Sequence, residues 1–288
     1  MIERSFILPF DRDRAIRGNV LIPDGPPPRS TIVAVHGFKG FKDWGFLPQV
    51  CESLAGDGHS VVSFNFSLNG ISEDLETLGR LEDFARNTFS AEVGELLRVL
   101  AEVRSGAILP RPTRRIGLLG HSRGGGIAVL AARDAAREGT PVDAPVTWAS
   151  VAHFDRWSPE TQEEWRETGR IHVMSPRTGQ HLPLDVGLLD DFEANRDRLD
   201  IERASSELET PWLVVHGDAD TSVAVDDAHR LIRANPSARL EIVAGAGHTF
   251  ETRHLFSGTT PALDHALSAT RRHFRKYLVP EGTPSVAP

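Results

Sequence analysis

Short apolar runs alternate along the chain with longer segments whose apolar positions repeat at helical spacing. Residues 31–35 form a continuous, β-branched apolar run, which is typical of a strand buried on both faces of a parallel sheet. Residues 84–103 instead carry Phe89, Val93 and Leu96 at helical spacing. Further strands are predicted at residues 5–10, 15–22, 60–66, 115–119, 144–151, 212–215 and 240–243, and further helices at 46–54, 127–137, 224–234 and 262–277. This alternation predicts an α/β fold with a mostly parallel sheet and helices on both faces.

One polar and uneven stretch, from about residue 154 to residue 209, breaks the alternation. We interpret it as a cap or lid insertion within a single domain that spans residues 1–288. Ser158 and Pro159 predict a helix start there, because Ser is a good N-cap and Pro suits the first helical position. Two strand-like runs, residues 171–174 and 181–184, predict a hairpin.

Composition is that of a soluble globular protein and limits its partners. The net charge of −8 argues against a nucleic-acid binder, and no apolar run approaches the ~20 residues of a membrane span. Cys51 is the single cysteine, so no intrachain disulfide can form. Since the N-terminus also lacks a signal-like apolar core, we expect a cytoplasmic protein, either a monomer or a homodimer. Residues 280–288 contain three prolines and are expected to be mobile.

A serine motif lies between a predicted strand and a predicted helix. Residues 120–124 read G-H-S-R-G and fit the pattern G-x-S-x-G. In that context the pattern predicts a sharp turn that presents the hydroxyl of Ser122 above the sheet, with glycines where side chains would meet backbone. Taken alone, the motif is also compatible with a glycine-rich turn that carries an incidental serine.

Two further polar loops follow predicted strands. Asp218 and Asp220 come after the strand at 212–215, and either carboxylate could orient an imidazole; one of them is expected to cap the following helix instead. His248 follows the strand at 240–243, where a loop histidine could act as a general base. The resulting order, Ser then Asp then His, is the order found in α/β-hydrolases.

The loop after the strand at 31–35 reads H-G-F-K-G and offers backbone N–H groups. A tetrahedral intermediate needs such donors for its oxyanion. We predict that one is the N–H of Arg123, next to the nucleophile, and the other the N–H of Phe38. A plain glycine-rich turn is the alternative interpretation.

Together these motifs resemble the α/β-hydrolase superfamily over nearly the whole chain. The residues that carry the resemblance are 36–38, 120–124, 216–220 and 247–250. The closest resemblance is to bacterial serine hydrolases of the dienelactone-hydrolase-like and cinnamoyl-esterase-like groups. It implies the α/β-hydrolase fold with a mostly parallel eight-stranded sheet. It also implies that the second acid of H-G-x-x-D, Asp220, is the triad member, with Asp218 as the alternative.

The sequence therefore predicts a serine hydrolase that cleaves small or aryl carboxylic esters through an acyl-enzyme on Ser122. Dienelactone hydrolases use cysteine as nucleophile, so a serine here favours ester chemistry. The alternatives are a thioesterase or small serine peptidase with the same triad, or a non-enzymatic binding module on this scaffold. No metal or organic cofactor is required, and the expected partner is a small-molecule ester.

Substrate specificity is expected to lie in the insertion and in the loop at residues 39–44. Lys39, Trp157 and Trp165 are the candidate pocket residues, although a tryptophan in a small insertion more often anchors it. His172 has no second His or Cys at ligand spacing, so no metal site is predicted there.

Overall fold

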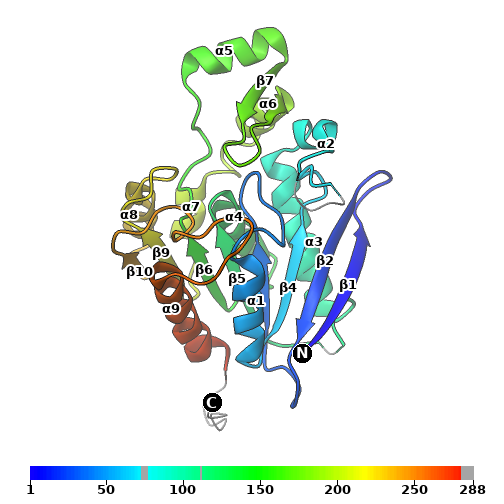
Figure 1. Cartoon of the computed structure of the whole chain (residues 1–288), viewed down its shortest axis with the longest axis vertical. Helices are drawn as coiled ribbons and strands as arrows, with labels where there is room; N and C mark the ends of the chain where they lie inside the picture. The colour runs from blue at the N-terminus through cyan, green and yellow to red at the C-terminus, as the bar shows by residue number, and fades with distance from the viewer. Residues whose placement is uncertain (73–76, 111, 280–288) are drawn as a thin grey trace.

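A computed structural model describes residues 1–72, 77–110 and 112–279. The expectation of a mobile tail at residues 280–288 lies outside this described part. An eight-stranded sheet forms the centre, in the order β1-β2-β4-β3-β5-β6-β9-β10 (Figure 1). Its strands are β1 (Ile2–Pro9), β2 (Ala15–Ile22), β3 (Thr31–Val35), β4 (Ser60–Asn65), β5 (Ile116–His121), β6 (Ala144–Trp148), β9 (Leu213–Gly217) and β10 (Arg239–Val243).

The sheet is mostly parallel, as the sequence predicts. Strands from β4 to β10 in the sheet order run parallel to one another, whereas β2 is antiparallel to both β1 and β4. β3 is buried at every position, which explains its uninterrupted apolar run. Because parallel strands end at the same edge, the loops after β3, β5, β9 and β10 meet there.

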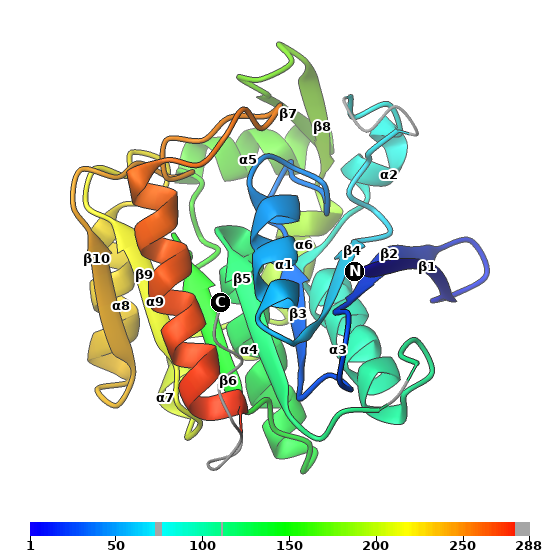
Figure 2. The same cartoon turned by 60° about the horizontal axis from the view of Figure 1, so that its bottom comes forward.

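Helices cover both faces of the sheet, as the alternating pattern predicts. α1 (Leu47–Gly56) and α9 (Pro261–Leu278) pack on one face, which Figure 2 shows from in front. The opposite face is covered by α3 (Phe89–Ser105), α4 (Arg123–Arg137), α7 (Ile201–Ser206) and α8 (Val225–Ala234). The two faces bury separate apolar clusters, so the central strands are excluded from water on both sides.

Two of the predicted helices differ from the structure by more than two residues at an end. The single helix predicted at residues 84–103 is two helices, α2 (Leu81–Ala85) and α3, because Thr88 is an N-cap whose side chain accepts from the Ala91 N–H. α4 begins directly after Ser122, four residues before the predicted start. Its first turn contains three glycines, which weaken the helical pattern in the sequence but allow close packing.

The part of the polar stretch at residues 154–209 that precedes α7 lies over the edge where the parallel strands end (Figure 1). It contains the predicted helix, α5 (Pro159–Thr168), capped by Ser158, and the predicted hairpin, β7 (Arg170–Met174) with β8 (His181–Asp185). The whole stretch also contains two helices that were not predicted, α6 (Gly187–Ala194) and α7. No helix in the described ranges is both long and apolar enough to cross a membrane.

Candidate active site

Ser122 lies in a strained turn between β5 and α4. Its φ of 57° is in the left-handed region, which is uncommon for a residue other than glycine. The backbone crowds this turn on both sides: a Cβ on Gly120 would lie 2.4 Å from the Gly124 carbonyl oxygen, and one on Gly124 would lie 2.3 Å from the His36 oxygen. Both glycines of the motif are therefore required by close backbone contacts, as the sequence reasoning assumed.

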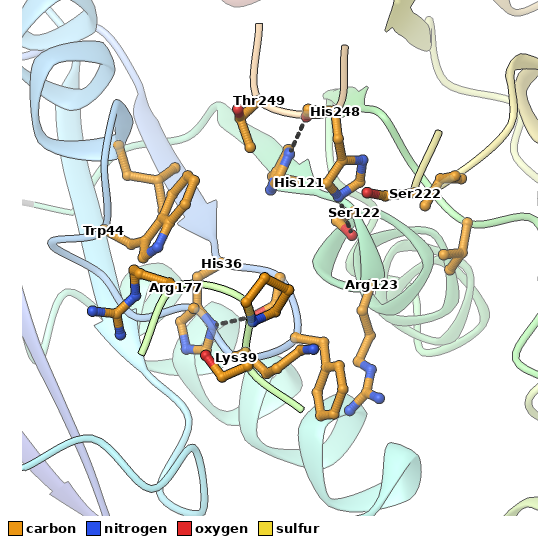
Figure 3. Close-up of a pocket in the computed structure, with 18 of the residues that line it drawn as sticks. His36, Lys39, Trp44, His121, Ser122, Arg123, Arg177, Ser222, His248 and Thr249 are labelled. Carbon is orange, nitrogen blue, oxygen red and sulfur yellow. Dashed lines mark hydrogen bonds between the residues drawn. The ribbon is translucent and has the colours of Figure 1, made fainter. Parts of the chain in front are cut away.

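The three residues singled out in the sequence meet at the edge of the sheet. His248 Nε2 lies 3.0 Å from Ser122 Oγ, and His248 Nδ1 lies 2.7 Å from Asp220 Oδ2. Since a carboxylate accepts, Nδ1 is the protonated nitrogen, and Nε2 is left with a lone pair directed at the serine hydroxyl (Figure 3). This is the arrangement that a general base needs in order to take a proton from serine.

Asp220, and not Asp218, contacts His248. Asp218 Oδ1 accepts from the Gly245 N–H at 2.6 Å, so it links the loops after β9 and β10. Asp220 Oδ1 accepts the backbone N–H groups of Ser222 and Val223 at 2.8 and 2.9 Å, which leaves Oδ2 facing the imidazole. Asp220 is thus fixed in one orientation.

A second histidine lies behind the Asp220 carboxylate. His216 is fully buried, its Nε2–H donates to the Val223 carbonyl at 2.9 Å, and Nε2 lies 3.5 Å from Asp220 Oδ2. Burial by itself raises the pKa of Asp220, but hydrogen bonds from His216, His248 and the Val223 N–H outweigh it and hold that pKa well below the usual value. The carboxylate is therefore ionised at neutral pH.

The loop after β3 lies directly against Ser122. A Cβ on Gly37 would lie 2.9 Å from Ser122 Cβ, so only glycine allows this approach. The Gly40 N–H donates to the Gly37 carbonyl at 3.0 Å and closes a turn in which Lys39 has a φ of 61°. Phe38 and Arg123 consequently flank Ser122 in the cavity wall, where their backbone N–H groups were predicted to act.

Two further histidines hold these loops, and the sequence reasoning did not assign them a function. His121 Nε2–H donates to the His248 carbonyl at 3.0 Å, and His36 Nε2 accepts from the Phe66 N–H at 3.3 Å. Burial lowers the pKa of His36 to about 4 and that of His121 to about 3. Both rings are neutral at pH 7, so they can fix the loops without adding charge beside Ser122.

Ser122 and His248 line a cavity of about 480 Å³. Lys39 lines it as predicted, but Trp157 and Trp165 do not. Trp165 is fully buried and its indole N–H donates to the Leu184 carbonyl at 2.8 Å, while Trp157 packs edge-on against it with ring centroids 5.0 Å apart. Trp165 belongs to the apolar cluster that also contains Phe89 of α3, and Trp157 packs against that cluster, so the two tryptophans anchor the insertion to the rest of the domain.

The insertion contributes other residues to the cavity instead. Arg156 lies just before α5, and Ser175, Pro176 and Arg177 lie in the β7–β8 turn. Lys39 Nζ donates to the Met174 carbonyl at 3.1 Å, so the loop after β3 contacts this hairpin. Arg156 and Arg177 carried no motif in the sequence; only their place in the polar insertion could have pointed to them. Among the described residues, no group of three or more His, Cys, Asp or Glu is arranged to hold a metal ion.

Comparison with known proteins places this arrangement in a family. Residues 32–257 match the model of the alpha/beta hydrolase family, and the chain belongs to that family. A search of curated proteins found no match.

Several solved structures share the fold at low sequence identity. Est1E from Butyrivibrio proteoclasticus with bound ferulic acid has a TM-score of 0.70 at 18% identity, covering 95% of this chain and 99% of that one. A putative hydrolase from Agrobacterium vitis S4 has a TM-score of 0.71 at 20% identity (94% and 98% covered). A dienelactone hydrolase from Anabaena variabilis has 0.62 at 17% identity (96% and 98% covered). The protein is thus an α/β-fold hydrolase by family.

Proposed function

We propose that the protein is a serine esterase that hydrolyses small or aryl carboxylic esters through an acyl-enzyme on Ser122. The observation that carries this proposal is the hydrogen-bonded series Ser122–His248–Asp220, with distances of 3.0 and 2.7 Å, in the wall of a cavity. Such a series activates a hydroxyl for attack on an acyl carbon. The structural similarity to Est1E with bound ferulic acid and to a dienelactone hydrolase supports the choice of ester chemistry.

The mechanism follows from where each atom lies. Ser122 Oγ attacks the ester carbonyl while His248 Nε2 takes its proton, and Asp220 stabilises the imidazolium through the Nδ1–H. The backbone N–H groups of Phe38 and Arg123 hold the oxyanion; removal of one such donor typically costs ~10²–10³ in turnover. His248 then protonates the leaving alcohol, and water releases the acid from Ser122.

Hydrolysis of a short-chain para-nitrophenyl ester by the wild type and by Ser122→Ala tests the proposal. Ser206→Ala is the matched control, because this exposed α7 hydroxyl donates only to the Arg203 carbonyl and does not line the cavity. We expect activity to be lost in Ser122→Ala and retained in Ser206→Ala. Equal rates in all three proteins would refute the function assigned to Ser122.

A thioester and an amide of the same acyl group, assayed beside the ester, separate the esterase from a thioesterase or a small peptidase. The proposal requires the oxygen ester to have the highest kcat/KM of the three. A higher value for either of the others would replace the esterase by the corresponding activity of the same triad.

A further inference from the structure

The side chain of Arg123 faces the cavity without a hydrogen bond to the described part of the protein. Only 11% of it is exposed, and its guanidinium carbon lies 3.8 Å from the Phe38 ring centroid and 5.0 Å from that of Phe89. Its nearest carboxylate, Glu92, is 3.8 Å away, beyond hydrogen-bond distance. A buried guanidinium has five N–H donors, and leaving them unused is costly. The donors are therefore available to a ligand in the cavity.

Lys39 places a second cation beside the same Phe38 ring. Its Nζ lies 5.2 Å from the Phe38 centroid, and the one hydrogen bond it donates within the described residues goes to the neutral carbonyl of Met174. Burial, and then the charge of Arg123, lowers the pKa of Lys39. An anion placed between the two side chains would relieve their mutual repulsion.

The charge of the cavity wall is one-sided although the chain as a whole is acidic, with a net charge of −8. Among the described residues that line the cavity, none is Asp or Glu, whereas four are basic: Lys39, Arg123, Arg156 and Arg177. Asp227 pairs with Arg156 at 2.8 Å, but its carboxylate lies outside the cavity lining, as does that of Glu92. The described cavity lining therefore carries an excess of basic side chains, and the carboxylates of Glu92 and Asp227, which pair with Arg123 and Arg156, lie behind it.

We propose that Arg123 and Lys39 form a carboxylate-binding subsite, and that the preferred substrates are half-esters whose acyl part ends in a carboxylate a few bonds from the ester carbonyl. This inference rests on the proposed esterase function and adds a substrate class to it. A planar guanidinium edge matches a carboxylate in a bidentate way, and the ammonium adds a second charge-assisted contact.

The position of His248 assigns the carboxylate to the acyl part of the substrate. His248 protonates the leaving oxygen, so the alcohol must lie on the histidine side of Ser122. Arg123 and Lys39 lie on the opposite side of Ser122 from His248 and Thr249 (Figure 3). The acyl chain, which extends away from the leaving group, is then the part of the substrate that reaches the two cations.

Two substrates that differ in one group test the subsite. The first is the para-nitrophenyl half-ester of glutaric acid, and the second is the glutaramate analogue, in which a neutral amide replaces the carboxylate. We expect the wild type to prefer the half-ester by about 10- to 100-fold in kcat/KM, the range for charged hydrogen bonds at a partly buried site. The preference should fall as salt is added. An equal kcat/KM for the two esters, or a higher kcat/KM for the glutaramate ester, would overturn the proposal.

Variants locate the preference in the two residues. Lys39→Gln and Arg123→Gln should each reduce the ratio of kcat/KM for the half-ester to kcat/KM for the glutaramate ester about tenfold. Most of this reduction should come from a lower kcat/KM for the half-ester. Lys42→Gln is the matched control, because this lysine of the same loop pairs with Asp43 at 2.7 Å and does not line the cavity. If Arg123→Gln does not fold with Glu92 left unpaired, Lys39→Gln carries the test. A ratio that falls equally in all variants would refute the assignment.

Failure of the subsite can be distinguished from failure of the esterase proposal. If neither ester is hydrolysed, the esterase function is wrong, and titration of glutarate into the wild type and Lys39→Gln then tests the subsite alone. Calorimetric binding that weakens in Lys39→Gln supports an anion subsite in a protein of another activity. Absence of binding, or binding that is unchanged in the variant, refutes it.

Discussion

Replacement of Asp220 by asparagine should nearly abolish turnover while it leaves the fold in place. The two backbone N–H groups of Ser222 and Val223, at 2.8 and 2.9 Å from Oδ1, require an oxygen at that position. In Asp220→Asn the amide oxygen therefore takes the Oδ1 place, and the amide NH₂ takes the place of Oδ2, 2.7 Å from His248 Nδ1.

That exchange reverses the tautomer of His248. An NH₂ group donates, so Nδ1 must accept, and the ring proton moves to Nε2, the atom 3.0 Å from Ser122 Oγ. A protonated Nε2 cannot take the proton of Ser122. The corresponding change in another serine hydrolase lowers turnover about 10⁴-fold, which is about 5 kcal/mol of transition-state stabilisation. We expect a loss of similar size here.

Asp218→Asn is the matched control on the same loop. Its Oδ1 accepts from the Gly245 N–H, and an asparagine oxygen can do the same, so turnover should stay within a few-fold of the wild type. Both variants are assayed on the same para-nitrophenyl ester, with circular dichroism to show that each is folded. Turnover of Asp220→Asn within tenfold of the wild type would refute the tautomer argument, and a large loss in Asp218→Asn alone would move the triad function to that residue.

Two further predictions concern stability. Burial lowers the pKa of His36 to about 4 and that of His121 to about 3. Both folded-state pKa values lie below the unfolded value of about 6.5, so the free energy of unfolding is highest above pH 6.5 and decreases as the pH falls toward 4. At pH 5 each histidine should lower the free energy of unfolding, measured with urea, by about 2 kcal/mol. A flat profile between pH 7 and pH 5 would contradict this. Trp165→Phe should lower the free energy of unfolding by about 1–3 kcal/mol, because the buried Leu184 carbonyl loses its donor. Trp157→Phe is the control and should lower it by less. Equal losses for the two variants in the same urea assay would show that this hydrogen bond is not the cause.

The order of the main elements could be predicted from the sequence because it depends on local patterns. The run at β3 is buried on both faces and is therefore apolar throughout, and α9 shows its buried face at helical spacing. The helix bounds at α2, α3 and α4 were wrong because a capping threonine and a glycine-rich first turn outweigh the hydrophobic pattern there. The positions of these boundaries depend on capping and on packing against the sheet.

The candidate triad could be inferred because each residue follows a strand in a recognisable order. The choice between Asp218 and Asp220 came only from family resemblance, since both lie in the same loop and have the same charge. In the structure the distinction is geometric: Oδ2 of Asp220 contacts the imidazole, whereas Asp218 holds a neighbouring backbone N–H. The tryptophans of the insertion were pocket candidates, with anchoring of the insertion as the favoured alternative, and the structure has them packed in or against the main apolar cluster and outside the cavity lining.

Local sequence is enough to specify the alternating strands and helices, the turn that carries Ser122 and the glycines that this turn requires, because each of these depends on neighbouring residues. The set of charged side chains that line the cavity depends instead on tertiary packing. Lys39, Arg123 and Arg177 are far apart in the chain and come from three separate elements, so no local pattern could bring them together. Glu92 pairs with Arg123 and Asp227 pairs with Arg156, and both carboxylates lie outside the cavity lining. This placement follows from how the insertion packs over the sheet edge.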